Sequence, residues 1–112
     1  ACIQALISAA SRGVAVRLIS AQLTQDGGDA NAPSRQTLSD GGVDARAGTS
    51  LYIHAKMILA DYGMSDQVAF VGSENFSDAS LDKNRELGIL VEDKTILDRL
   101  NTVFEQDWAK ES

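Results

Sequence analysis

The sequence predicts an α/β fold in which helices flank a mixed β-sheet. Apolar residues recur with helical spacing near both ends of the chain, and short apolar runs of strand length lie between them. At 112 residues the chain is one domain at most, and its 44% apolar content is enough to bury a core. We therefore expect a single domain over residues 1–112.

The first expected element is a helix that ends at Gly13, a typical C-terminal stop signal. A short β-branched run over residues 14–19 follows and is typical of a buried strand. The apolar face of the helix repeats at i, i+3, i+4 and i+7 and consists of Ile3, Leu6, Ile7 and Ala10.

Residues 21–50 have a different, polar composition that glycines interrupt repeatedly. We expect a long loop here, with at most one helical turn after Pro33. Long loops in compact domains are either functional or disordered, and a lid and a flexible insert would share this composition. Both interpretations stay open for this segment.

The second half of the chain predicts three strands and a final helix. Residues 51–60 form the first strand, a hairpin loop containing Gly63 follows over residues 61–67, and the second strand ends at Gly72. Residues 87–91 form the third strand, and Asp93 can cap the last helix. The expected apolar face of that helix consists of Ile96, Leu100, Val103, Phe104 and Trp108.

Charge and cysteine content narrow the classes of function. The formal net charge is −6, and residues 54–86 hold three basic against six acidic side chains, so a groove for long nucleic acid is disfavoured. Cys2 is the one cysteine, which permits no internal disulfide. No transmembrane segment or signal peptide is visible, and because the chain starts at Ala1 we expect a processed or partial sequence.

The most informative stretch reads H-x-K-x4-D and consists of His54, Lys56 and Asp61. Residues two apart on a strand share a face, so His54 and Lys56 should point the same way. Asp61 has the opposite parity and should lie at the strand end, in a structural role. Two further polar runs follow, Gly72-Ser73-Glu74-Asn75 and Asn84-Arg85-Glu86-Leu87-Gly88.

This order of motifs resembles the phospholipase D superfamily, the HKD enzymes that include phospholipase D and cardiolipin synthase. The resemblance covers nearly the whole chain and implies roles for individual residues. His54 would be nucleophile or general acid and Asp61 the supporting motif aspartate, while Glu86 would orient the histidine. Phosphate would be bound by Lys56, Ser73 and Asn75.

The chemistry of these side chains fits those roles. An imidazole can attack a phosphodiester phosphorus and form a phosphohistidine, and Lys56 can compensate the negative oxygens. Asn75 can donate an amide N–H and Ser73 a hydroxyl, while Gly72 lets the backbone approach closely. A nucleophilic imidazole also needs its far nitrogen held, which a carboxylate such as Glu86 does.

The chain contains a single histidine, whereas HKD chemistry uses two, so the resemblance implies one of two half-sites. Family domains also have strands before the first helix that are missing here. We therefore expect a truncated domain, corresponding to the C-terminal catalytic half of a two-motif enzyme. The second half-site would come from the same full-length chain or from a homodimer.

The resemblance predicts a phosphodiesterase or phosphatidyltransferase that acts on phospholipid headgroups, with peripheral membrane contact. A homodimeric HKD endonuclease and a catalytically silent fragment are the alternatives. No metal or other cofactor is expected, because one His and one Cys form no ligand cluster and Lys56 would repel a divalent cation. The compartment stays open, since bacterial cell-envelope and secreted settings both fit.

Overall fold

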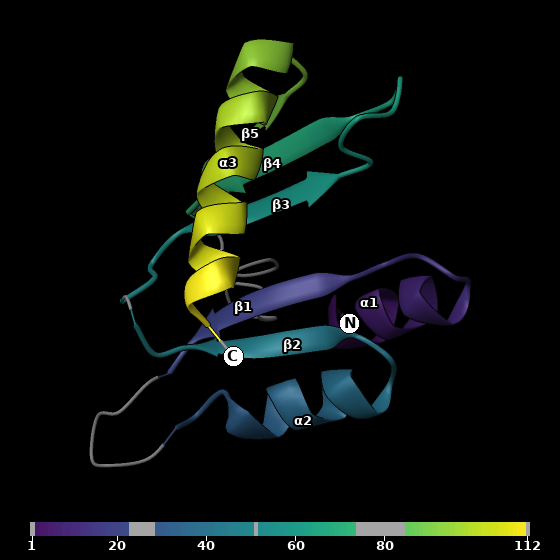
Figure 1. The fold of residues 1–112 in the computed structure, drawn as a ribbon, viewed down its shortest axis with the longest axis vertical. Coiled ribbons are helices and arrows are strands. Elements are labelled where there is room, and N and C mark those ends of the chain that lie inside the picture. The colour runs from purple at the N-terminus through teal and green to yellow at the C-terminus, as the bar shows by residue number, and fades with distance from the viewer. Residues whose placement is uncertain (1, 23–28, 51, 74–84, 112) are drawn as a thin grey trace. The chain divides into compact units, whose positions relative to one another are not determined.

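The computed structural model describes residues 2–22, 29–50, 52–73 and 85–111. It confirms the α/β class, with both parallel and antiparallel strand pairs (Figure 1). In chain order the elements are α1 (Cys2–Ser11), β1 (Arg17–Ala21), α2 (Ala32–Asp40), β2 (Asp44–Gly48), β3 (Lys56–Ala60), β4 (Val68–Gly72), β5 (Gly88–Val91) and α3 (Lys94–Lys110).

The chain divides into two compact units, which are described separately. The first comprises Ala1–His54 with Trp108–Ser112, and the second comprises Ala55–Asp107. The strands follow this division, because β1 pairs with β2 in one sheet and β3, β4 and β5 form another. The expectation of one domain that lacks N-terminal strands stays a prediction.

In the first unit, α1 confirms the predicted helix and its stop. Gly13 has a φ of 92°, a left-handed conformation that favours glycine, and the Val14 N–H donates to the Ala9 carbonyl at 3.2 Å. The strand expected over residues 14–19 is displaced toward the C-terminus, since β1 begins at Arg17 and Val14 is half exposed.

The long loop expected over residues 21–50 is wrong for the described residues of that range. They contain the helix α2, which has a proline in its first turn, and the strand β2, which pairs in parallel with β1. The register runs from Arg17 opposite Asp44 to Ala21 opposite Gly48. Residues 23–28 lie outside the described residues, so the choice between lid and flexible insert is untested there.

The strand β2 was missed because its own sequence carries little strand signal. It reads Asp-Ala-Arg-Ala-Gly and contains no β-branched residue. Its position depends instead on β1 and on the packing of α2 against it. Leu38 of α2 and Val43, directly before β2, are both buried and form the core of this layer.

In the second unit the three strands are antiparallel in the order β3-β4-β5. β4 and β5 match the predicted strands closely. The strand expected over residues 51–60 is shorter, because β3 begins only at Lys56. The hairpin loop that joins β3 to β4 is confirmed, and Gly63 within it has a φ of 87°.

The final helix α3 confirms the predicted cap but corrects the predicted apolar face. The Asp93 carboxylate accepts a hydrogen bond from the Ile96 N–H at 3.0 Å, as an N-cap does. Leu97 is fully buried, whereas Ile96 and Val103 are partly exposed. The apolar face of α3 therefore includes Leu97 in place of Ile96, and Trp108 is buried near the C-terminal end of the helix.

No helix in the described parts of the chain has the length and apolar character needed to cross a bilayer.

Candidate active site

Lys56 lies at the start of β3, in a row of residues that crosses the second sheet. Its register partner on β4 is Gly72, whose partner on β5 is Gly88. Neither glycine places a side chain beside the half-buried Lys56. Glycine inside a strand often marks a place where a ligand approaches the backbone closely. The row therefore combines one cation with two residues that have no side chain, a combination that suits an anionic group.

Ser73 directly follows β4 and is held by three hydrogen bonds. Its N–H donates to the Leu87 carbonyl at 3.0 Å, and its Oγ accepts from the Leu87 N–H at 3.1 Å. The same hydroxyl donates to Glu86 Oε2 at 2.5 Å, a short, charge-assisted bond. Two predicted site residues, Ser73 and Glu86, are thus in direct contact, which the sequence did not predict.

This contact bears on the predicted roles of both residues. A hydroxyl has one proton to donate, and here the Ser73 proton goes to the Glu86 carboxylate. To donate to a phosphate, the hydroxyl must turn away from Glu86. The carboxylate is in turn oriented by this bond, two residues before β5, where Glu86 is half-buried.

His54 is exposed and precedes β3, so the parity argument that placed it on a strand with Lys56 is wrong in its premise. The His54 ring contacts that of Tyr52. The two rings are stacked, with centroids 6.0 Å apart and planes 23° from parallel. His54 and Tyr52 belong to the first unit, whereas Lys56, Ser73 and Glu86 belong to the second.

Asp61 follows the last residue of β3, at the strand end, as its spacing predicted. It is the one non-glycine residue with a positive φ, 54°, in the described parts of the chain. Its carbonyl accepts the Met64 N–H at 2.9 Å and so closes the turn toward β4. Aspartate tolerates the left-handed region better than most residues do. The conformation supports a structural role in the hairpin.

Asn75, the third predicted phosphate ligand, lies outside the described residues, so its role stays a prediction. Across residues 2–22, 29–50, 52–73 and 85–111, no three His, Cys, Asp or Glu side chains gather as they would around a metal ion.

The structure also reveals a carboxylate that sequence reasoning missed. Glu111 is buried, and its oxygens accept hydrogen bonds from Thr49 and Ser50, the residues that follow β2. A contact across about sixty positions leaves no local pattern in the sequence. The one available signal was a polar pair, Thr49-Ser50, a few residues before the motif histidine.

Comparisons with known proteins agree with the motif. The sequence model of the family described as "Cardiolipin synthase, PLD-like domain" matches residues 1–108. A segment of 54 residues is 33% identical to phospholipase D zeta 2 of Arabidopsis thaliana. That segment covers 46% of this chain and 5% of the plant protein, so the chain corresponds to a small part of that relative.

Proposed function

Because this chain belongs to the phospholipase D-like family of cardiolipin synthase, we propose that it supplies one of two half-sites of a phosphodiester-cleaving enzyme. The substrate class we propose is phospholipid headgroups, and the reaction is hydrolysis or phosphatidyl transfer. The observation that carries the proposal is the row of Lys56, Gly72 and Gly88, with Ser73 directly after Gly72, inside a family match that spans residues 1–108.

In the proposed reaction, an imidazole nitrogen attacks the phosphorus, and the bond from phosphorus to the leaving alcohol breaks. An acid, the histidine of the other half-site, gives its proton to that alcohol. Water or a second alcohol then attacks the phosphorus of the phosphohistidine and gives its proton to the histidine that acted as the acid. The bond from phosphorus to nitrogen breaks, which restores the imidazole. His54 is the nucleophile or the acid in this scheme.

Lys56, Ser73 and Asn75 are the proposed ligands of the phosphate oxygens, whose charge grows as the nucleophile adds. The support for Lys56 is its position opposite Gly72, with Gly88 next in the same row across the sheet. Ser73 is already oriented by Leu87, and its hydroxyl needs only a rotation away from Glu86 to donate to phosphate. Asp61 has a supporting role as the residue that shapes the hairpin.

Glu86 is proposed to hold the far nitrogen of His54 and to favour the imidazolium as it forms. The bond from Ser73 fixes the carboxylate in one orientation, which is what an orienting residue requires. The same bond would couple phosphate binding to Glu86. When the Ser73 hydroxyl turns to phosphate, one lone pair of the carboxylate becomes available to His54.

The experiment uses the full-length protein that carries this chain. Phosphatidylglycerol vesicles and, separately, plasmid DNA are supplied, and products are followed by mass spectrometry and by gel. We expect headgroup release or transfer that His54→Asn abolishes and that Glu92→Gln, a matched change at an exposed carboxylate, leaves intact. DNA cleavage that depends on His54 would instead favour the homodimeric nuclease. A folded protein that cleaves neither substrate would support the silent-fragment alternative.

A further inference from the structure

Glu111 is the one charged side chain that is buried in the described parts of the chain, with 5% of its surface exposed. Its Oε2 accepts the Thr49 N–H at 2.9 Å and the Thr49 hydroxyl at 2.8 Å. Its Oε1 accepts the Ser50 N–H at 2.9 Å. A buried carboxylate is costly unless it is partnered, and here both oxygens are partnered by one short segment.

The hydrogen bonds favour the ionised form of this carboxylate. The Thr49 N–H, followed by the Ser50 N–H, lowers the pKa of Glu111 below its ordinary value, against the opposing effect of burial. The bonds are therefore charge-assisted at neutral pH, which makes them about twice as strong as bonds between neutral groups.

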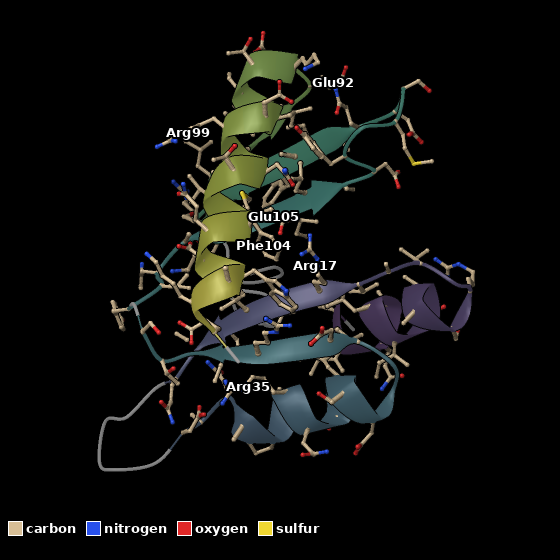
Figure 2. All side chains as sticks on the ribbon, in the orientation of Figure 1. Arg17, Arg35, Glu92, Arg99, Phe104 and Glu105 are labelled. Carbon is tan, nitrogen blue, oxygen red and sulfur yellow. The ribbon has the colours of Figure 1, made fainter. Side chains whose placement is uncertain are left out.

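The backbone around Glu111 is itself fixed from β1 and β2. Arg46 donates from one nitrogen to the carbonyls of Trp108 at 3.1 Å and of Glu111 at 3.0 Å. The Arg46 guanidinium lies 3.7 Å from the centroid of the Trp108 ring, and that of Arg17 lies 5.2 Å from it (Figure 2 labels Arg17). Glu111 thus joins residues 49 and 50 to Arg46 of β2, and we call it the anchor of these two residues.

Thr49 and Ser50, the residues that Glu111 holds, lie a few positions before the motif histidine in the sequence. Ser50 precedes His54 by four positions, and the stacked ring of Tyr52 lies between them in sequence. The anchor, the segment and His54 all belong to the first compact unit. The family match covers residues 1–108 and so does not include Glu111.

We propose that Glu111 is a positioning residue for His54: it fixes the start of the segment that carries the imidazole. The inference rests on the proposed function for its catalytic consequence, but the placement of His54 can be measured without any turnover. A carboxylate that only stabilised the fold would affect unfolding and leave the imidazole where it is.

The kinetic test compares Glu111→Gln with Glu92→Gln in the full-length protein, at a temperature where both stay folded. A glutamine offers one accepting oxygen in place of two, so the segment loosens. We expect kcat to fall by about 10²-fold, as for a misplaced reacting group, with KM little changed because Lys56 and Ser73 are untouched. Glu111→Asp, which keeps the charge on a shorter stem, should recover part of the loss.

The spectroscopic test records the imidazole ¹H–¹⁵N signals of histidine-labelled protein, with His54 assigned by its loss in His54→Asn. Glu111→Gln should shift or broaden the His54 signals, and Thr49→Val, which removes only the hydroxyl bond, should do so to a smaller extent. If the His54 signals and kcat of Glu111→Gln match those of Glu92→Gln, the inference is overturned. If the wild-type protein cleaves no phosphodiester but the His54 signals still move, the proposed function fails and the positioning role stands.

Discussion

At the scale of single residues, the contact between Ser73 and Glu86 changes how the candidate site is understood. The sequence predicted separate tasks for them, phosphate binding for one and histidine orientation for the other. The structure joins them through a hydrogen bond of 2.5 Å. In the proposed site, substrate phosphate and the Glu86 carboxylate would compete for the single Ser73 proton, so the two proposed tasks would be coupled.

Glu86→Gln should slow the chemical step while the fold is retained. An amide carries no charge to favour an imidazolium, and loss of an orienting carboxylate in a serine-protease triad costs about 10⁴ in rate. We expect a smaller loss here, roughly 10²–10³, because phosphate binding by Lys56 persists. The measurement is the single-turnover rate of the full-length protein together with its thermal midpoint.

Asp61→Asn is the matched control for that experiment. Asparagine also tolerates a φ of 54°, so the turn should form and the rate should stay close to that of the wild type, with any effect confined to the midpoint. If Asp61→Asn loses the rate at an unchanged midpoint while Glu86→Gln keeps it, the roles of the two carboxylates are reversed.

The lowered pKa of Glu111 predicts how the unfolding free energy depends on pH. Its pKa is lowered in the folded protein, so its contribution is complete above the ordinary glutamate pKa of about 4.3 and is lost as the pH falls through the lower folded value. The difference in unfolding free energy between wild type and Glu111→Gln should be constant near neutrality and shrink on acidification. A difference that grows toward low pH would contradict the assigned direction.

At the scale of elements, local signals predicted some segments and tertiary contacts decided others. The end of α1 at Gly13 and the Asp93 cap of α3 are encoded within a few residues, and both are confirmed. The strand β2 has no such signal, because it exists through pairing with β1 and packing of α2. Tertiary contacts also decide that Leu97 is buried while Ile96 is exposed. Helical periodicity alone fits an apolar face that contains either residue.

The packing of α1 against α2 depends on the absence of a side chain at Gly41. A Cβ there would lie 2.6 Å from Ile7 Cγ1, closer than atoms in contact can be, although the backbone φ of −87° is ordinary. Gly41→Ala should therefore cost about 1–3 kcal/mol of unfolding free energy through overpacking. Urea unfolding of Gly41→Ala, Ile7→Ala and the double variant should show that the double variant loses less than the sum of both.

Gly42→Ala is the control for this packing effect. Gly42 has a φ of 95° and its Cβ would meet only Ala10 at 3.7 Å, so its substitution acts through the backbone. Ile7→Ala should leave the cost of Gly42→Ala unchanged. Equal rescue of both glycine variants by Ile7→Ala would show that Ile7 does not clash specifically with position 41.

At the scale of the whole molecule, the motif predicted the family, which the match over residues 1–108 establishes. It also placed Asp61 at a strand end correctly. It did not predict the Ser73–Glu86 bond, the Tyr52–His54 stack or the Glu111 anchor, because each arises from folded geometry. The spacing of the motif residues predicts their proposed chemistry. The contacts that position those residues involve other parts of the chain and leave no pattern in the motif.

The isolated 112-residue chain should be inactive as a monomer. It contains one histidine, whereas displacement at a phosphodiester needs both a nucleophile and an acid for the leaving group. The measurement is turnover of a chromogenic phosphodiester across a range of chain concentrations. Activity of the monomer that rises with the first power of concentration would show that one half-site suffices.

The most direct test of the central claim, that His54 takes part in phosphodiester chemistry through a covalent histidine adduct, is a quenched reaction of the full-length protein with a phosphodiester substrate. Mass spectrometry then locates any acid-labile phospho-adduct on its peptides. We predict an adduct on a histidine, either His54 or that of the other half-site, whose formation His54→Asn abolishes or slows strongly while Glu92→Gln does not. An adduct that forms at the wild-type rate in His54→Asn, or turnover without any histidine adduct, would contradict the account.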